Sequence, residues 1–347
     1  MTKANLVPCS RLGAKFPANF ALFMNAPVFL NEDQVRKHLR MADLIPAMEH
    51  ALIDFSAGKV TQPVRQVIPV DPPGGFYGIM PALTGDGLGQ KIVTFYPPNA
   101  GKGIHTHMAL IVLNNRETGE PIAVMDGRLI TEMRTAAVSA AATKLLAPPA
   151  AKVLAILGSG VQARSHFEAL RLVRNFEEVR VWSRTKLHAE EFAKEISALW
   201  HRHPADGTSR TGLSLAGSHC HVTSPEEAVR GADVVVTVTS SQTPVLRGTW
   251  LKRGCHVNAI GACRPDWREL DDDAMRNSVL FVDSREAAMK ESGDVILSGA
   301  KIHAELGEAF SGKIEINPEK TTIFKSLGMA VEDVAAALLV YRAATAA

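Results

Sequence analysis

The spacing of apolar and polar positions changes near Leu129. Before this point, apolar residues at helical spacing over 32–55 precede several short strand-like runs, separated by turns rich in glycine and proline. These runs predict strands at Val64–Val70, Phe76–Pro81, Lys91–Tyr96, Met108–Asn114 and Pro121–Asp126. Strands joined by short turns pair antiparallel, because parallel neighbours need a crossover of roughly a dozen residues.

After Leu129, strands and helices alternate. The segment 129–146 is rich in alanine and stopped by two prolines, which predicts a largely buried helix. Apolar strands follow, with helices between several of them, at 152–157, 179–182, 219–222, 233–239, 256–261 and 279–283. This alternation is typical of a doubly wound parallel sheet. The polar stretch 201–218 is expected to form a surface connection.

The last segment, 321–344, predicts a short strand and a long apolar helix, with no evident place in the parallel sheet. We expect it to return to the first region. The predicted fold class is therefore α/β, with a Rossmann-type doubly wound sheet (129–319) inserted into a second, α+β domain (29–128 plus 320–347). We interpret 1–28 as a flexible extension, although its basic, acid-free composition leaves an organelle-targeting leader open.

Composition limits the class of partner. Of 347 residues, 46% are apolar, which is enough to bury the cores of two domains. Because 38 Lys+Arg face 36 Asp+Glu, nucleic acid is not an expected partner. No apolar run approaches the roughly 18 residues that cross a bilayer, so no membrane partner is expected. The four scattered cysteines favour a reducing compartment, and we expect a cytoplasmic protein.

A glycine-rich turn predicts a dinucleotide site. The run Gly158-Ser-Gly-Val-Gln-Ala163 directly follows an apolar strand and opens a helix, which is the context that binds a pyrophosphate. The next strand ends in Ser183-Arg184-Thr185, where an NAD site would carry Asp or Glu. A guanidinium flanked by two hydroxyls suits a ribose 2′-phosphate, so we predict NADPH as the cofactor.

Three isolated cations are candidates for chemistry beside this cofactor. Lys91 opens a strand, Arg65 lies in a predicted strand, and Arg134 lies in an otherwise apolar helix. Each has a structural alternative, because a lysine can reach solvent at a strand end and a buried arginine can pair with a protein carboxylate. Together the three fit a small carboxylate substrate.

Other polar positions have weaker signals. His105 and His107 share a strand face without a third metal ligand at a suitable spacing, so we expect a polar pocket wall and no metal. Cys263 and Arg264 directly follow a predicted strand, where ligands of parallel sheets bind. Ser326 is expected either to cap the last helix or to face a ligand.

A series of motifs runs in order along the chain: "QPVRQVIPV", "KIVTFY", "AVMDGRLITEMRTAAVSA", "ILGSGVQARSHFEAL", "RVWSRT", "GADVVVTVTS", "NAIGACRPDWREL", "KESGDVILSGA" and "EKTTIFKSLGMAVED". In these motifs, and from Phe29 to Tyr341, the chain resembles the ornithine cyclodeaminase/mu-crystallin family. The resemblance implies a homodimer whose first region and last helix form a substrate-binding and dimerisation domain. It implies NADPH-dependent reduction of cyclic ketimines such as piperideine-2-carboxylate and sulfur-containing analogues, including precursors of thiomorpholine-carboxylate. It also implies thyroid hormone (T3) as a ligand of the same pocket.

The resemblance also assigns residues. The cofactor contacts that it and the glycine motif imply are Arg134, Gly158, Ser159, Gly160, Val161, Gln162, Ser183, Arg184, Thr185, His188, Thr239, Ser240, Ile260 and Ser326. The substrate contacts that it implies are Arg65, Lys91, His107 and Glu291. We take Arg65 and Lys91 as the catalytic residues, which hold the α-carboxylate of the imine while Lys91 keeps its nitrogen protonated.

Three alternative functions stay open. One is reductive amination of a keto acid, as in the alanine dehydrogenases of this family. Another is ornithine cyclodeamination, which the sequence disfavours because cyclodeaminases carry an Asp where this chain has Cys263. The third is a hormone-binding or lens-structural protein with minor activity.

Overall fold

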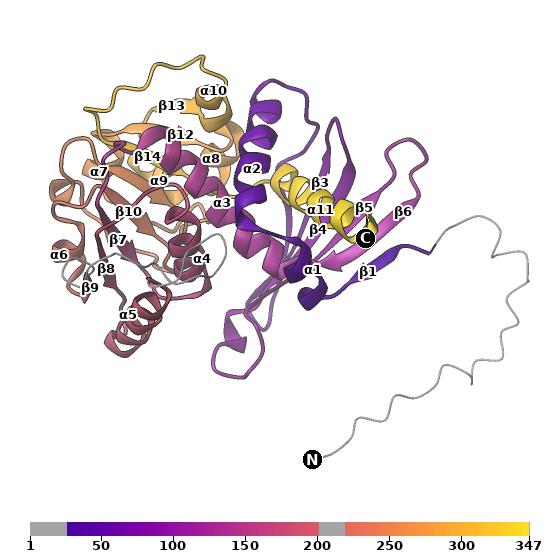
Figure 1. Cartoon of the computed structure of the whole chain (residues 1–347), viewed down its shortest axis with the longest axis horizontal. Coiled ribbons are helices and arrows are strands. Elements are labelled where there is room, and N and C mark those ends of the chain that lie inside the picture. Colours follow the sequence, from indigo (N-terminus) through magenta and orange to yellow (C-terminus); the bar gives the residue numbers. More distant parts are fainter. Residues whose placement is uncertain (1–25, 201–218, 347) are drawn as a thin grey trace, which may run out of the picture.

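The structure is a computed structural model, and it describes residues 26–200 and 219–346. Two sheets organise the described chain (Figure 1). Most of the predicted N-terminal extension, residues 1–25, and the predicted surface connection 201–218 lie outside the described residues. The boundary at residue 28 is slightly too late, because the first strand begins at Val28.

The first sheet has six strands in the order β1-β6-β5-β4-β3-β2. Their bounds are β1 Val28–Leu30, β2 Gln66–Val70, β3 Gly75–Leu83, β4 Leu88–Phe95, β5 His107–Asn114 and β6 Pro121–Asp126. From β2 to β6 the pairing is antiparallel, which confirms the prediction from short turns. The short strand β1 pairs parallel with β6 and was not predicted.

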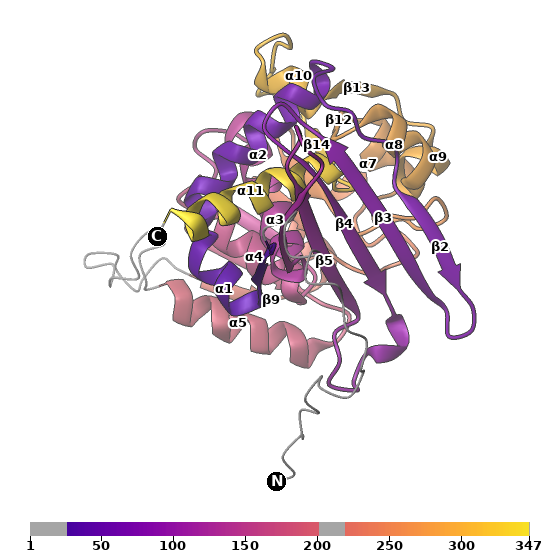
Figure 2. The same cartoon turned by 90° about the vertical axis from the view of Figure 1, so that its right-hand side faces the viewer.

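Helices cover one face of this sheet. They are α1 (Glu32–His38), α2 (Met41–Ser56) and α11 (Ala330–Thr345), and α11 packs on β3, β4, β5 and α2. A short 3-10 helix, η2 (Pro97–Asn99), follows β4. Side chains therefore alternate along each strand between this covered inner face and an outer face. Figure 2 shows the ribbons of β2 to β5 side by side in this sheet. On the outer face Leu110 and Ile68 are half exposed.

The second sheet has eight parallel strands in the order β13-β12-β14-β11-β10-β7-β8-β9. Their bounds are β7 Val153–Leu157, β8 Glu178–Trp182, β9 His219–Val222, β10 Val234–Thr237, β11 His256–Ala259, β12 Val279–Val282, β13 Ile302–Glu305 and β14 Thr322–Lys325. The accompanying helices are α3 Arg128–Leu146, α4 Val161–Leu170, α5 Lys186–Trp200, α6 Pro225–Val229, η3 Gly248–Trp250, α7 Asp272–Arg276, α8 Arg285–Glu291, α9 Gly293–Ser298 and α10 Leu306–Phe310. The Rossmann-type fold class is confirmed.

The expectation that 321–344 has no place in the parallel sheet is wrong for its strand. β14 pairs with β11 and with β12, in the registers Ala259↔Lys325 and Phe281↔Phe324. Only the helix α11 returns to the first domain, as expected. The chain therefore crosses between the domains at 326–329, several residues later than the predicted boundary at 320. This crossover lies at the carboxyl end of the sheet, where ligands of parallel sheets bind.

The Ala-rich helix α3 joins the two halves of the molecule. It packs against α2 and α11 of the first domain and against α4 and β11 of the second (Figure 1). Its small residues, including Ala136, Ala137 and Ala140, are fully buried, so its neighbours approach closely. The buried Arg134 on this helix is thereby placed between the domains. In the described part of the chain, no helix is long and apolar enough to cross a membrane.

Candidate active site

The glycine-rich turn has the geometry that a dinucleotide needs. At Gly158 the φ angle is 132°, and a Cβ there would lie 2.7 Å from the carbonyl oxygen of Val238, so only glycine fits. Gly160 is the N-cap of α4, and a Cβ there would meet no atom within 4 Å. The space in front of this helix N-terminus is therefore open to a phosphate, which the helix dipole and free N–H groups favour.

The end of β8 carries the polar group predicted to bind the adenosine ribose. Ser159 Oγ donates a hydrogen bond to Ser183 Oγ at 2.9 Å, which joins the glycine turn to the end of this strand. Arg184 and Thr185 are exposed, and Arg184 has no ion pair or hydrogen bond within the described chain. Its guanidinium is thus free to bind a ligand. His188 is exposed on the first turn of α5.

One arginine that the sequence did not single out supports this turn. Arg164 Nη1 donates to the carbonyl oxygen of Ser159 at 2.6 Å, and its other nitrogens pair with Glu195 at 2.5 and 2.7 Å. Its Cζ also lies 5.2 Å from the ring centroid of Phe192. Arg164 therefore holds the backbone of the glycine turn in place through the carbonyl group of Ser159.

Two orphaned polar atoms fit a bound dinucleotide. Gln162 Oε1 and Ser326 Oγ are buried and have no hydrogen-bond partner in the described chain. Buried polar atoms of this kind are rare in folded proteins unless a ligand or water satisfies them. Because α11 begins at Ala330 with Met329 as its N-cap, the helix-capping interpretation of Ser326 is wrong. Its hydroxyl remains free for a ligand.

Glu269 connects the ends of β10 and β11. This fully buried carboxylate accepts hydrogen bonds from the Thr237 hydroxyl at 2.9 Å and from both the N–H and the hydroxyl of Thr239 at 2.6 Å. It also accepts from the N–H of Gly261 at 2.6 Å. The predicted cofactor contacts Thr239, Ser240 and Ile260 lie on these two segments. Sequence reasoning missed Glu269, because no local spacing reveals which backbone it reaches.

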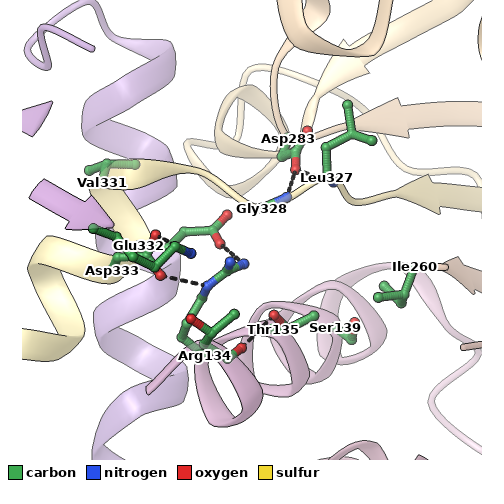
Figure 3. Close-up of polar contacts among 12 residues, drawn as sticks. Arg134, Thr135, Ser139, Ile260, Asp283, Leu327, Gly328, Val331, Glu332 and Asp333 are labelled. Carbon is green, nitrogen blue, oxygen red and sulfur yellow. Dashed lines mark hydrogen bonds and ion pairs between the residues drawn. The ribbon is translucent and has the colours of Figure 1, made fainter. Parts of the chain in front are cut away.

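Lys91 and Arg134 meet two carboxylates on the first turn of α11. Lys91 Nζ lies 2.7 Å from Asp333 Oδ2. Arg134 Nε donates to Asp333 Oδ1 at 3.0 Å, and its Nη1 donates to Glu332 Oε2 at 2.7 Å, as Figure 3 shows. All four side chains are nearly or fully buried. Arg134 therefore has protein carboxylates as its partners, and Lys91 does not extend to solvent at a strand end.

Burial and charge oppose each other in this cluster. Burial lowers the pKa of Lys91 to about 8, although Asp333 favours the charged form. Burial alone would raise the pKa of Asp333, but Lys91 and Arg134 hold that pKa below its usual range. Asp333 is thus a stable anion, while the Lys91 ammonium titrates close to physiological pH. A buried group with such a shifted pKa is a candidate for proton transfer.

Residues 326–329, where the chain crosses between the domains, hydrogen-bond to both Asp283 and Arg65. The N–H groups of Leu327 and Gly328 donate to Asp283 at 2.6 and 2.8 Å, while their carbonyl oxygens accept from Arg65 Nη2 at 2.8 and 3.1 Å. Gly328 has a φ of 77°, and a Cβ there would overlap the guanidinium of Arg134. Glycine is therefore required for two independent reasons, conformation and space.

Two predicted substrate contacts form an ion pair. Arg65 Nε lies 3.0 Å from Glu291 Oε2. With Nε and Nη2 engaged, Nη1 of Arg65 has no partner within the described residues. Burial raises the pKa of Glu291, although Arg65 favours its ionised form. The two residues thus lie together beside the domain crossover.

His107 and Phe76 lie on the inner face of the first sheet. Burial and the Lys91 charge lower the pKa of His107 to about 4, so it is a neutral wall residue. His105 lies outside β5 and is exposed, which corrects the expectation of a shared strand face. Arg264 Cζ lies 5.2 Å from the ring of Phe76 and 5.1 Å from the ring of Trp267, and so bridges the two domains.

A metal centre is absent from the described residues, and one surface hollow lies away from the charged cluster. Among residues 26–200 and 219–346, no group of three or more His, Cys, Asp or Glu side chains could hold a metal. A surface hollow of about 690 Å³ includes Val279 and Thr321 in its lining, at the amino ends of β12 and β14. Because ligands bind at the carboxyl ends of parallel strands, we place the active site at the opposite edge.

The predicted cofactor and substrate groups thus converge on one edge of the Rossmann sheet. Residues 25–347 match the model of the ornithine cyclodeaminase/mu-crystallin family. The chain belongs to this family.

Three relatives within this family are particularly informative. The ketimine reductase mu-crystallin of Mus musculus is 52% identical over 322 residues, covering 91% of this chain and 97% of the mouse protein. The Δ1-pyrroline-2-carboxylate reductase of Thermococcus litoralis, solved with NADH and L-proline, is 36% identical, with a TM-score of 0.84 over 92% of this chain and 98% of its own. An archaeal alanine dehydrogenase dimer with bound NAD is 32% identical, with a TM-score of 0.83 over 92% and 96%.

Proposed function

We propose that this protein is an NADPH-dependent reductase of cyclic ketimines, such as piperideine-2-carboxylate and its sulfur-containing analogues. The observation that carries the proposal is the convergence of Arg65, Lys91 and Arg134 at the carboxyl end of a dinucleotide-binding sheet. Relatives that share most of the chain are a ketimine reductase and a pyrroline-carboxylate reductase. The substrate class is therefore a ring that contains C=N next to a carboxylate.

Arg65 and Lys91 have N–H groups left over that can donate to the carboxylate of a substrate. Arg65 Nη1 has no protein partner within the described chain, and the Lys91 ammonium carries N–H groups beyond the one that faces Asp333. An arginine and a lysine that are already held by Glu291 and Asp333 are pre-organised, so little rotamer entropy is lost on binding. We assign these two groups to the α-carboxylate of the imine.

Lys91 also controls the proton on the ring nitrogen. Its pKa of about 8 keeps most of it charged at neutral pH, while leaving the proton mobile. A protonated C=N is the better hydride acceptor, and hydride is the chemistry that a bound nicotinamide cofactor supplies. The neutral His107 adds a wall to the pocket without adding charge.

The preference for NADPH rests on the end of β8. Arg184 is exposed and free, and Ser183 and Thr185 flank it with hydroxyl groups. No carboxylate stands at these three positions to hold a ribose 2′-OH. The two solved relatives named above contain NADH and NAD, so a phosphate preference would distinguish this chain from them.

We further propose that a second copy of the chain covers the outer face of the first sheet. Phe29, Ile68, Met108 and Leu110 are 68%, 57%, 39% and 51% exposed, and the strand registers place all four on this face. Large contiguous apolar surfaces on a soluble domain usually mark an interface. The related alanine dehydrogenase is a dimer, which supports a homodimer here.

A spectrophotometric assay tests the proposed activity. NADPH oxidation by the purified protein is measured with cyclic imino acids of different ring size and with pyruvate plus ammonia. Ammonia release is measured with ornithine and NAD. We expect the cyclic imino acids to be turned over and the other two substrates not to be. Turnover of pyruvate only with ammonia would favour an alanine dehydrogenase instead. Tight, NADPH-dependent binding of thyroid hormone (T3) with negligible turnover would favour the hormone-binding alternative, and ammonia release from ornithine would favour the cyclodeaminase.

A further inference from the structure

The cluster around Arg134 contains more carboxylates than cations. Its cations are Lys91, Arg134 and Arg65, and its carboxylates are Asp333, Glu332, Asp283 and Glu291. If all these groups were ionised, three positive charges would face four negative charges, giving a net charge of −1. A substrate carboxylate would add another negative charge in a region largely removed from water. Uncompensated charge in such a region is costly.

Glu332 and Asp283 differ in their hydrogen bonds. Its Oε2 accepts from Arg134, whereas its Oε1 is buried without a partner in the described chain. Asp283, in contrast, accepts three backbone N–H groups, from Ser284, Leu327 and Gly328. A buried oxygen without a donor stabilises an anion poorly, and protonation of this oxygen removes the charge that burial disfavours.

The surroundings of Glu332 favour its neutral form. Burial raises its pKa to about 7, and Asp283 at the end of β12 and the adjacent Asp333 act in the same direction. Arg134 on α3 and the backbone N–H of Met329 act in the opposite direction. Figure 3 shows the Glu332 carboxylate against Arg134, and Asp283 against the backbone nitrogen of Gly328 in the crossover. Another negative charge in the cleft would therefore raise the pKa of Glu332 further.

We propose that Glu332 takes up a proton when the carboxylate of the substrate binds. This inference rests on the proposed function, because it requires an anionic substrate at Arg65 and Lys91. The charge of the cluster then stays at −1: the substrate adds one negative charge and the protonated Glu332 removes one. At the same time Arg134 loses one of its two counter-charges, so its positive field becomes available to the substrate. Glu332 is a positioning residue that acts through Arg134.

Infrared difference spectroscopy can detect this proton directly. The probe is pyrrole-2-carboxylate, a planar cyclic carboxylate that cannot accept hydride, added at pH 8 to the protein with NADPH bound. At this pH the free protein has mostly ionised Glu332, so binding should produce the carbonyl stretch of a protonated carboxylic acid. Lys91 can also take up a proton on binding, but an ammonium group has no such band. The band should be absent in Glu332→Gln, remain in a shifted position in Glu332→Asp, and be unchanged in Glu168→Gln, which removes an exposed carboxylate of α4.

Binding affinity gives a second measurement. Between pH 7 and pH 8 the wild-type affinity for pyrrole-2-carboxylate should fall by up to about tenfold, and Glu332→Gln should remove this part of the fall; above pH 8 the loss of the Lys91 proton adds to it. If calorimetry shows that pyrrole-2-carboxylate binds the wild type but no carbonyl band of a protonated carboxylic acid appears, the inference is overturned. The proposed function would then stay intact. A band that persists unshifted in Glu332→Gln would also overturn the inference. Absence of any binding would count against the carboxylate site itself, and so against both proposals.

Discussion

Lys91 Nζ lies 2.7 Å from Asp333 Oδ2, although the two residues belong to β4 and to the last helix of the chain. Asp333 also accepts from Arg134 on α3, so three elements meet at one carboxylate. The chain reaches this point only because α11 returns from the Rossmann sheet to the first domain. The charged cluster and the domain crossover are therefore one structural unit.

Replacing Lys91 with Met should abolish turnover and leave NADPH binding intact. The variant removes the group that holds the substrate carboxylate and the nitrogen proton, but the glycine turn and the end of β8 are unaffected. Removing one partner of a buried pair costs roughly 3–5 kcal/mol of stability, and Arg134 keeps Asp333 partly compensated here. Steady-state kinetics and fluorescence titration with NADPH measure the two effects. Unchanged turnover would remove Lys91 from the mechanism.

The binding of pyrrole-2-carboxylate should weaken as the pH rises through about 8. Burial lowers the pKa of Lys91 to that value, so the ammonium is charged below it and neutral above it. An anionic ligand loses its attraction to Lys91 when the proton leaves. Calorimetric titration across this range is the measurement, with Glu332→Gln as the background so that only Lys91 contributes. Lys91→Arg keeps its charge and should flatten the profile; an equally steep fall in that variant would exclude Lys91 as the cause.

The sequence predicted the elements and the glycine turn better than the contacts of the charged cluster. Apolar periodicity and glycine spacing are local signals, so they identified the strands other than β1 and β13, the helix α3 and the turn at Gly158. The partners of Lys91 and Arg134 could not be found in this way, because Glu332 and Asp333 lie in an apolar helix at the other end of the chain. The same limit hid the place of β14 in the sheet: its four buried residues are strand-like, but the order of strands in space sets its neighbours β11 and β12.

Replacing Gly328 with Ala should reduce both stability and turnover. The backbone has a φ of 77°, and the added Cβ would overlap the Arg134 guanidinium. The strained backbone alone costs about 1–3 kcal/mol, and a displaced Arg134 would leave Glu332 and Asp333 without their shared partner. Chemical denaturation and steady-state kinetics measure these effects.

Gly312 offers a matched control for this substitution. It has a φ of 74°, but a Cβ there would meet no atom within 4 Å. Gly312→Ala should therefore show only the backbone cost, with normal turnover. Equal loss of stability in the two variants, with equal turnover, would show that the contact between Gly328 and Arg134 has no functional role.

Replacing Arg184 with Ala should weaken NADPH binding and leave NADH binding unchanged. A charge-assisted pair between a guanidinium and the 2′-phosphate contributes about 1.5–3 kcal/mol, which corresponds to roughly 10- to 100-fold in affinity. Arg180 on β8 serves as the control, because it is already paired with Glu178 and its removal should affect both cofactors alike. Fluorescence titration with each cofactor is the measurement. Wild-type protein that binds NADH as tightly as NADPH would contradict the assignment.

Replacing Leu110 with Glu should dissociate the proposed homodimer. Leu110 is 51% exposed on the outer face of the first sheet, and a buried carboxylate at an apolar interface costs several kcal/mol. Leu297 on α9 is 52% exposed but lies on the other domain, so Leu297→Glu controls for the surface change alone. Sedimentation equilibrium should give a monomer for the Leu110 variant and a dimer for the Leu297 variant. A Leu110→Glu protein that remains dimeric would place the interface on another surface, because the outer sheet face could not then be covered by an apolar contact with a second copy.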